Sequence, residues 1–364
     1  MCYHMKLGLI SLGATSGKWI AEKARQYFDE VEDINLKEIN IKSTHQGKEV
    51  FYKNKPLQHY DCIYQRGSFR YELVRRAIAD ILHKKCYTPL HPDAYSLCHN
   101  KFLTALALQN ENVPIPETHF AATTETAREV IKDIKYPIIL KVPQGTQGKG
   151  VLFADSYPSA KTLLDALDAF NQKYLIQEFV DTDGCDLRAI VVGNKVIAAM
   201  RRVAKKGEMR ANIHQGGHGE PVILDERTKQ IAIKAAKAVK AEVCGVDILE
   251  GTRPVVLEVN SSPGIKGITE ATGIDVADKI AKYLYDRTIE VTKRRENKGF
   301  DGIMKDLEQQ NEFVSALSVK LGIIKLPEIV TKLTGFKDED EVLIKGEKGK
   351  IEIVKSNFNK KGGR

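Results

Sequence analysis

The stretch VVLEVNSSPG (255–264) constrains the fold most strongly, because polar residues enter a strand that is otherwise apolar. Side chains alternate between the two faces of a β-strand, so Val256, Glu258 and Asn260 should share one face and the other apolar residues the opposite one. The strand stops at once in a Ser-Ser-Pro-Gly loop. A carboxylate and an amide are therefore expected to point the same way beside a rigid turn.

The preceding strand, GVDILE (245–250), also carries an acid, Asp247, in an apolar run. The short polar link EGTRP predicts that the two strands form an antiparallel pair, which would bring Asp247, Glu258 and Asn260 together. Three hard oxygen ligands suit magnesium or manganese, which also keep waters and substrate phosphates in their coordination shells. The alternative, a solvated sheet face, does not explain why both strands break to an acid or amide within apolar runs.

The composition indicates a soluble globular protein of several domains. A chain of 364 residues is too long to fold around one ordinary hydrophobic core. Its composition, with 42% hydrophobic and 29% charged residues, argues against a mainly disordered chain. It contains neither an apolar run of roughly 20 residues, which a membrane span needs, nor a credible signal peptide. We therefore expect a cytoplasmic protein with no membrane partner. Six scattered cysteines without a CxxC pair indicate a reducing compartment rather than a zinc or disulfide framework.

The chain is basic, with a net charge of +8 and a sequence pI near 8.9. This charge suits an anionic partner such as a nucleotide, an acidic peptide or nucleic acid. A lysine-rich solvated surface explains the same charge equally well, so the charge alone does not choose among these partners.

The order of the predicted elements divides the chain. Strands alternate with helices from KLGLISLG (6–13) onward, a pattern typical of a parallel α/β unit. GATSGK (13–18) is not a phosphate loop, because it is one residue short of the motif and Trp19 stands where Ser or Thr should bind magnesium. A tight hairpin is expected around Gly193-Asn194. The expected parts are an α/β domain at 1–90, a second domain at 91–290, a linker at 291–312, a strand-rich domain at 313–356 and a basic tail at 357–364.

Two further segments could bind a nucleotide. Lys141 ends the strand YPIILK, and the glycines of the following PQGTQGKG loop would let backbone N–H groups approach a phosphate closely. A plain hairpin turn is the competing interpretation. The strand end formed by Gln177, Glu178, Phe179 and Val180 could bind adenine through backbone groups and ribose through a carboxylate, although a solvated strand end has the same pattern.

Arginines crowd the predicted hairpin and the loop after it, at positions 188, 201, 202 and 210. Asp186 and Arg188 share one strand face, whereas Arg201 and Arg202 must point to opposite faces, so at most one of that pair should reach the site. Guanidinium groups suit carboxylates and phosphoryl oxygens because two parallel N–H bonds match their geometry. A cationic surface is the alternative.

His214 and His218 lack a third ligand at suitable spacing, which favours a loop role over a zinc site.

These segments closely resemble the ATP-grasp superfamily and, within it, the RimK family of α-L-glutamate ligases. The matching segments are KVPQGTQGKGV, QEFV, GCDLRAIVVGNKVIAAMRR, AKKGEMRANIHQGG, GVDIL and VLEVNSSPGIKGITEATGID. The likeness runs from about Lys101 to Asp286 and, more loosely, back to Lys6. It implies a chain of α/β and α+β class: an ATP-grasp fold with an N-terminal Rossmann-like preATP-grasp domain, ATP clamped between two subdomains, and a small C-terminal β-rich domain.

The resemblance, together with the local patterns, gives individual residues expected roles. Those expected to bind ATP are Lys101, Lys141, Gly145, Gly148, Gln177, Glu178, Phe179, Val180, Asp186, Arg210 and Asn212. Those expected to bind two divalent ions, Mg²⁺ or Mn²⁺, are Asp247, Glu258 and Asn260. Those expected to act in catalysis are Arg188 and Arg201, at the acyl phosphate and the substrate carboxylates, and Arg210, beside the phosphates.

The resemblance also implies a reaction. A substrate carboxylate attacks the γ-phosphate of ATP to form an acyl phosphate, and an amino-acid amine then attacks it to form an amide. Such chemistry needs positioning and charge neutralisation more than a side-chain nucleophile. The expected amine is L-glutamate, and the expected acceptor is the carboxylate of a protein C-terminus, a peptide or a small cofactor. A ligase for a different amino acid is the alternative.

The C-terminal segment LGIIKLPEIVTKLTGFKDEDEVLIKGEKGKIEIVK (321–355) resembles an AbrB-like swapped-hairpin module, in which two chains interlock. The resemblance implies a homo-oligomer. Modules of that family often bind DNA, but the first strand here lacks a dense row of Arg and Lys, which favours dimerisation. A nucleotide-sensing DNA-binding regulator is the alternative from another class. The full set of Lys141, Asp247, Glu258 and Asn260 argues against it, because a degenerate sensor has no need for every metal ligand.

Overall fold

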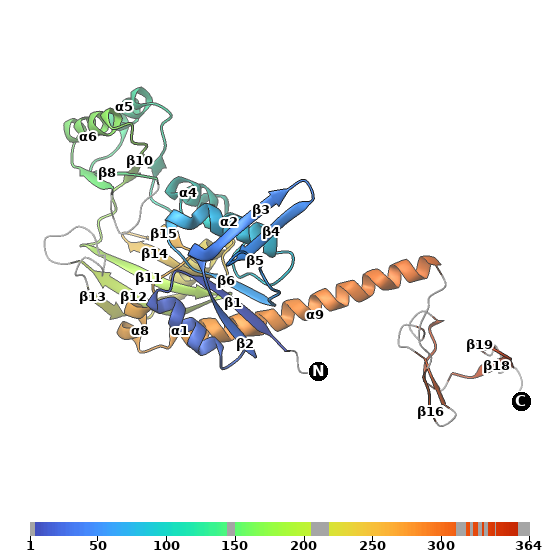
Figure 1. The fold of residues 1–364 in the computed structure, drawn as a ribbon. Coiled ribbons are helices and arrows are strands. Elements are labelled where there is room, and N and C mark those ends of the chain that lie inside the picture. The colour runs from blue at the N-terminus through green and yellow to red at the C-terminus, as the bar shows by residue number, and fades with distance from the viewer. Residues whose placement is uncertain are drawn as a thin grey trace, which may run out of the picture. The chain divides into compact units, whose positions relative to one another are not determined.

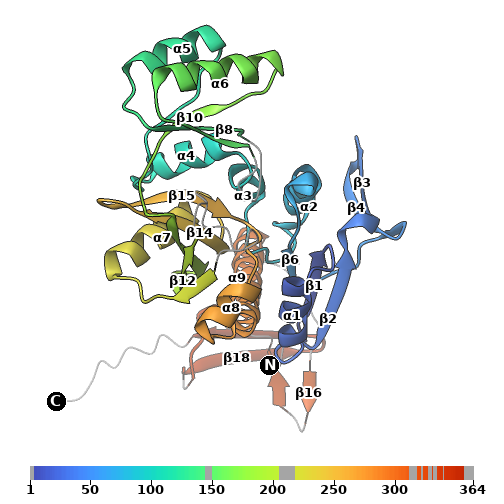
Figure 2. The ribbon, with the colours of Figure 1, turned by 90° about the vertical axis from the view of Figure 1, so that its left-hand side faces the viewer.

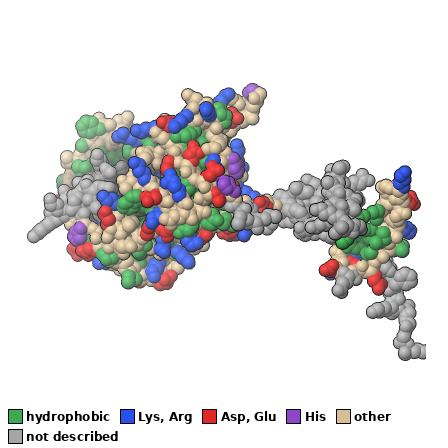
Figure 3. All heavy atoms as spheres, turned by 60° about the horizontal axis from the view of Figure 1, so that its bottom comes forward, with side chains coloured by type: hydrophobic (Ala, Val, Ile, Leu, Met, Phe, Trp, Pro, Cys, Tyr) green, Lys and Arg blue, Asp and Glu red, His purple; other side chains and the backbone are tan. Residues whose placement is uncertain are grey.

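The protein divides into two compact units, Met1–Val291 and Thr292–Arg364 (Figure 1). Among the helices of the described part, none is long and apolar enough to cross a membrane. On the face of the first unit in Figure 3, basic and acidic side chains are interspersed. The computed structural model describes residues 4–143, 150–204, 218–310, 318–320, 323–326, 330, 334–338 and 340–355.

The N-terminal region is the parallel α/β unit that the strand–helix alternation predicts. Its sheet consists, in spatial order, of the parallel strands β2 (Glu30–Asn35), β1 (Lys6–Ser11) and β6 (Cys62–Gln65). Strands β1 and β6 are followed by helices α1 (Thr15–Ala24) and α2 (Glu72–Leu82). An antiparallel arm that was not predicted is inserted between β2 and β6 and consists of β3 (Ile39–Thr44), β4 (Gly47–Tyr52) and β5 (Lys55–Pro56).

A four-stranded antiparallel sheet follows, and it has a hydrophobic core of its own. Its strands, in spatial order, are β7 (Thr118–His119), β10 (Leu175–Glu178), β8 (Ile138–Lys141) and β9 (Val151–Ala154). One face of this sheet is covered by helices α5 (Thr124–Asp133) and α6 (Tyr157–Ala169), which lie side by side (Figures 1 and 2). Thr123 caps the N-terminus of α5, where its side chain accepts a hydrogen bond from Thr126 N.

A five-stranded antiparallel sheet forms the rest of the first unit. Its strands, in spatial order, are β13 (His218–Pro221), β12 (Lys195–Val203), β11 (Cys185–Val192), β14 (Val243–Glu250) and β15 (Pro254–Asn260). The associated helices are α3 (Pro92–Leu97), α4 (Lys101–Asn110), α7 (Glu226–Ala238), α8 (Lys266–Thr272) and α9 (Val276–Gln310). This sheet shares a core with the N-terminal region. The two-residue turn between β11 and β12 confirms the hairpin predicted at Gly193-Asn194, and Gly193 has the positive φ of 61° that such a turn requires.

The pairing of β14 with β15 confirms the predicted antiparallel pair and corrects one detail. Asp247 lies opposite Glu258, but the next pair is Ile248 with Val256, so Leu257 is an extra residue. Such a bulge shifts the alternation of side chains by one position. Val256 therefore shares a face with Ile248 and not with Glu258, contrary to the regular alternation expected from the sequence.

In the C-terminal part, helix α9 runs on to Gln310, through most of the segment expected to be a linker. Two short strands, β16 (Ser318–Lys320) and β17 (Ile323–Lys325), pair antiparallel. Strands β18 (Val342–Glu347) and β19 (Lys350–Lys355) form a hairpin around the Gly-Glu-Lys-Gly sequence, with φ of 80° at Gly349.

Candidate active site

Two arginines and two aspartates form one hydrogen-bonded cluster on strands β11, β12 and β14. Asp186 lies opposite Arg202, whose Nε and Nη2 donate to the two carboxylate oxygens at 2.5 and 2.7 Å. Arg188 lies opposite Asp247 and donates to both of its oxygens, from Nε at 2.8 Å and from Nη2 at 2.6 Å. Arg202 Nη2 also reaches Asp247 Oδ2 at 2.8 Å. The cluster balances two negative with two positive charges.

Because the cluster is largely buried, its ion pairs strongly affect the pKa values of Asp186 and Asp247. Asp186, Arg202 and Asp247 are buried. Burial alone would raise the pKa of Asp247, but Arg188 and Arg202 hold it well below its usual range. Burial, and then the charge of Asp247, raise the pKa of Asp186. Asp247 is therefore the carboxylate that stays ionised as the pH falls.

The three predicted metal ligands meet at the end of the β14–β15 pair. Glu258 lies opposite Asp247, and Asn260 lies opposite Gly245 and accepts a hydrogen bond from Ser262 N at 2.9 Å. Burial, and then the nearby Asp247, raise the pKa of Glu258. A divalent cation would relieve this repulsion, so the donor set fits Mg²⁺. Among the described residues no three His, Cys, Asp or Glu side chains gather in a group that could hold a metal ion.

The position of the Ser-Ser-Pro-Gly loop after β15 depends on a close contact between Pro263 in the loop and Gly245 on β14. A Cβ atom at Gly245 would lie 2.9 Å from Cβ of Pro263, a distance that real Cβ contacts do not reach. The loop therefore packs directly over β14, two residues from Asp247, only because position 245 has no side chain. This contact fixes the loop beside the carboxylates.

Two lysines from different elements lie near enough to Glu258 for its charge to affect them. Lys101 begins α4, and its backbone N–H donates to Pro143 O at 3.1 Å, which ties the helix start to the segment after β8. Lys141 ends β8 and donates from Nζ to Gln177 Oε1 at 2.5 Å. Burial, with the charge of Lys101, lowers the pKa of Lys141 to about 8, and Glu258 opposes the shift. Burial also lowers the pKa of Lys101, again against Glu258.

The predicted adenine segment lies where the four-stranded and five-stranded sheets meet. Gln177 Nε2 donates to Thr118 Oγ1 at 2.8 Å, and Glu178 accepts from the backbone of Glu117 at 3.0 Å. The ring of Phe179 packs edge-on against Phe153, with centroids 5.3 Å apart. Beyond it, a Cβ atom at Gly251 would lie only 2.7 Å from Val180 Cγ1. The side chains of Gln177 and Glu178 thus fix the strand end.

Arg201, a predicted catalytic residue, lies apart from the charged cluster. It bonds Glu250 from Nε at 3.2 Å and from Nη2 at 2.8 Å, and both side chains are 40% exposed. The turn pairs Val192 with Lys195, so a regular register would set Asp186 opposite Arg201. A bulge at Ile197 shifts the register by one residue and brings Arg202 there instead.

Four predicted site residues lie outside the described residues, as does His214. They are Gly145, Gly148, Arg210 and Asn212.

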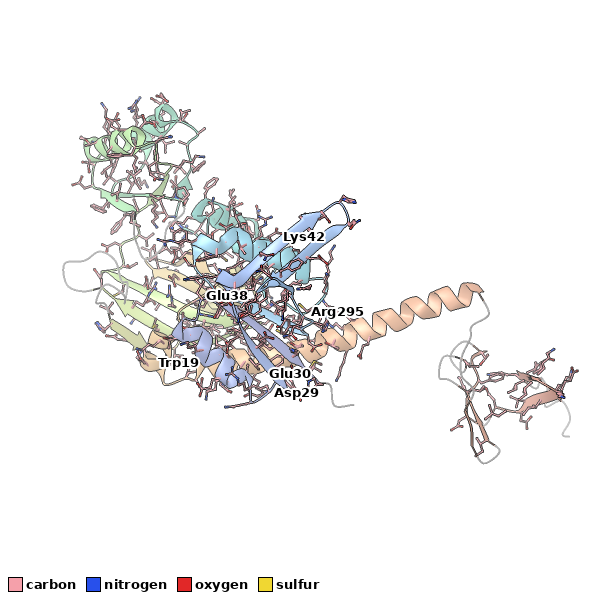
Figure 4. All side chains as sticks on the ribbon, in the orientation of Figure 1. Trp19, Asp29, Glu30, Glu38, Lys42 and Arg295 are labelled. Atoms are coloured by element: carbon pink, nitrogen blue, oxygen red, sulfur yellow. The ribbon has the colours of Figure 1, made fainter. Side chains whose placement is uncertain are left out.

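A hollow of about 420 Å³ lies elsewhere in the first unit, beside α1 and the start of β2. Asp29 and Glu30, two of its lining residues, are labelled in Figure 4. None of its lining residues belongs to the cluster described above.

Comparison with known proteins identifies the region that carries this site. Residues 98–284 match the model of the RimK-like ATP-grasp domain. A probable alpha-L-glutamate ligase of Thioalkalivibrio sulfidiphilus is 35% identical over 77% of this chain and 95% of its own length. One of Cellvibrio japonicus, with the same description, is 33% identical over 81% of this chain and 100% of its own length.

Solved structures share the fold at low sequence identity. The ATP-grasp ligase PsnB, complexed with a minimal precursor, superposes with a TM-score of 0.61 at 18% identity, over 78% of this chain and 99% of that one. A RimK domain ATP-grasp protein of Sphaerobacter thermophilus gives 0.59 at 17% identity, over 76% of this chain and 98% of that one. The mixed α/β and α+β architecture expected from the sequence is thereby confirmed.

Proposed function

Because the chain belongs to the RimK-like ATP-grasp family and is an ATP-dependent ligase, we propose that it joins the amino group of L-glutamate to a carboxylate acceptor. The acceptor would be the C-terminus of a protein or peptide, or a small cofactor. The observation that supports this most is that the positive charges of Lys101 and Lys141 act on Glu258, which lies opposite Asp247 on the neighbouring strand.

In this proposal the two lysines bind the phosphates of ATP, and the end of β10 binds the adenine. Asp247, Glu258 and Asn260 would hold two divalent ions, Mg²⁺ or Mn²⁺, which supply positive charge to the phosphate oxygens. A PsnB structure contains Mg and ADP. Asp247 can accept from Arg188 and Arg202 and still bind a metal, because an ionised carboxylate has about four lone-pair sites.

The reaction would proceed in two displacements. An acceptor carboxylate oxygen attacks the γ-phosphorus, ADP leaves, and an acyl phosphate forms. The glutamate amine then attacks the acyl carbon, loses a proton and expels inorganic phosphate. Arg188 and Arg210 would stabilise the charge on the acyl phosphate and substrate carboxylates, because guanidinium groups match their geometry. Arg202 would act as a positioning residue that holds Asp247.

The test is ADP release by the purified full chain with ATP and Mg²⁺, with amino acids supplied one at a time. Each amino acid is tested with and without peptides that end in a free carboxylate. We expect glutamate to stimulate release and Glu258→Ala to abolish it. Glu270→Ala, on the exposed surface of α8, is the matched control. Stimulation by another amino acid, or by none, would contradict the proposal.

We also propose that the chain forms a homodimer through its C-terminal unit. Strands β17, β18 and β19 expose large apolar side chains, and a two-stranded hairpin alone is marginally stable in water. The most exposed are Ile323 at 70%, Ile344 at 62%, Leu343 at 55% and Ile351 at 51%. A second copy of the same hairpins would bury them. Analytical ultracentrifugation of the full chain should give a dimer that Leu343→Glu with Ile351→Glu dissociates, and a monomeric wild type would contradict it.

A further inference from the structure

A second pair of arginines lies where the N-terminal region meets the Ser-Ser-Pro-Gly loop. Arg66 follows β6 and is 6% exposed, and Arg75 on α2 is fully buried. Arg66 Nη2 donates to Pro263 O at 2.5 Å, and Arg75 Nη2 donates to Ser262 Oγ at 2.9 Å. These bonds join the N-terminal region to the loop that directly follows Glu258 and Asn260.

Within the described residues, this pair has no acidic partner of the kind that Arg188 and Arg202 have. Across the described part of the chain, the hydrogen-bond acceptors of Arg66 and Arg75 are carbonyl oxygens, hydroxyls and the ring of His99. Arg75 Nε is buried without a hydrogen-bond partner there. Burial, and the charge of Arg66, lower the pKa of Arg75. Two buried positive charges without a counter-ion are costly, which indicates that an anion neutralises them in the working enzyme.

His99 connects this pair with the nucleotide end of the site. Its Nε2 lies 3.5 Å from both Arg75 Nη1 and Ser261 Oγ. Burial, with the charges of Arg75 and Lys101, lowers the pKa of His99 to about 4, so the ring is neutral near pH 7. It therefore does not offset the positive charge of the arginines. The cations run from Arg66 and Arg75 past His99 to Lys101, toward the proposed phosphates.

We infer that Arg66 binds a substrate carboxylate other than the reacting one, and that Arg75 is the positioning residue that holds it there. Arg66 has five N–H donors, of which the bonds to Tyr64 Oη and Pro263 O use two. Arg75 supports the turn at Arg66 by donating to Gln65 O and Gly67 O. The inference rests on the proposed ligase activity and deepens it.

The carboxylate has two sources: the glutamate that is added, or a non-reacting carboxylate of the acceptor. Arg66→Gln in the full chain distinguishes them by the Michaelis constants of the three substrates. Loss of a charge-assisted hydrogen bond should raise one of them by about tenfold or more, while KM for ATP stays within about twofold. A rise for glutamate identifies the added amino acid, and a rise for the acceptor identifies that substrate.

Matched variants separate binding from folding. Arg76→Gln, one residue after Arg75 on α2, removes an exposed arginine that pairs with Asp93 and should leave all three constants unchanged. Arg66→Lys should recover part of the affinity because it keeps the positive charge. Equal changes in all three constants, or no change in a folded Arg66→Gln, would overturn the assignment.

Failure of the subsite is distinguishable from failure of the proposed reaction. Wild-type turnover with glutamate is measured first. Should no amine support turnover, isothermal titration of glutamate and of glutarate, a dicarboxylate without an amine, still compares wild type with Arg66→Gln. Weaker binding to the variant supports the subsite, whereas equal affinities or no binding to the wild type overturn it.

Discussion

The two arginine pairs of the first unit differ in the charge of their partners, and the difference separates a pair balanced by acids from a pair that keeps its positive charge. Arg188 and Arg202 bond Asp186 and Asp247 and so cancel their charge within the protein. Arg66 and Arg75 bond neutral acceptors and keep theirs. A balanced buried network fixes geometry, whereas an unbalanced one attracts an anion. In the proposed reaction the first pair would hold the metal-binding carboxylate of Asp247, with Arg188 also beside the acyl phosphate, and the second pair would bind a further substrate carboxylate.

The largest effect is expected where the balanced pair meets the proposed metal. Asp247→Asn keeps the shape of the side chain but removes the negative charge that faces Arg188 and Arg202. We expect kcat for ADP release to fall by at least about 100-fold at any Mg²⁺ concentration. Titration of the rate with Mg²⁺ measures this. A rate within about tenfold of wild type would remove Asp247 from the metal site.

The free energies of unfolding of single variants test whether the acid-balanced arginine pair contributes more to stability than the pair with neutral partners. Arg202→Met leaves the buried carboxylate of Asp186 without its partner and should lower the free energy of unfolding by about 3–5 kcal/mol. Arg75→Met leaves only neutral acceptors unpaired, so we expect a smaller loss of about 1–3 kcal/mol. Urea unfolding compares the two variants. A larger loss of unfolding free energy in Arg75→Met than in Arg202→Met would mean that Arg75 serves mainly to stabilise the fold.

The pH dependence of ATP binding tests the role of Lys141, which is half-buried. Burial lowers the pKa of Lys141 to about 8, so the unliganded site loses this positive charge as the pH rises through 8. KM for ATP should therefore rise between about pH 7 and 9, and bound phosphates would oppose the loss. Lys141→Arg, which stays charged, should flatten the profile. An identical rise in that variant would assign the effect to another group.

The smallest effect is expected at Arg201, on the solvent side of the hairpin. Its pair with Glu250 is exposed, and such pairs contribute about 0–1 kcal/mol. Arg201→Ala should leave kcat within about twofold of wild type and barely change the free energy of unfolding. A large loss of kcat would restore the role that its sequence position suggested.

Arg201 and Arg202 also show how far sequence alone could lead. Alternation predicted that at most one of them points to the site. The bulge at Ile197 decides which one pairs with Asp186, and no residue type signals that bulge. The bulge at Leu257 moved Val256 in the same way. Regular elements follow from local periodicity, whereas a register shift depends on how the finished sheet packs.

Contacts between distant segments were equally inaccessible. The bond between Arg75 and Ser262 joins residues 187 positions apart, and no local pattern predicts it. In contrast, Asp247 and Glu258 lie on consecutive strands, so their pairing could be inferred from the short link between them. Lys101 entered only through resemblance to a family, because a lysine at a helix start carries no signal of its own.

The most direct test of the proposed function is the mass of an acceptor peptide after incubation with the full chain, ATP, Mg²⁺ and an equimolar mixture of the twenty amino acids. The peptide ends in glutamate with a free carboxylate, and an amidated copy serves as the control. A glutamate ligase should add only glutamyl residues, and only to the free carboxylate. Addition of a different amino acid, or to the amidated peptide, would contradict it.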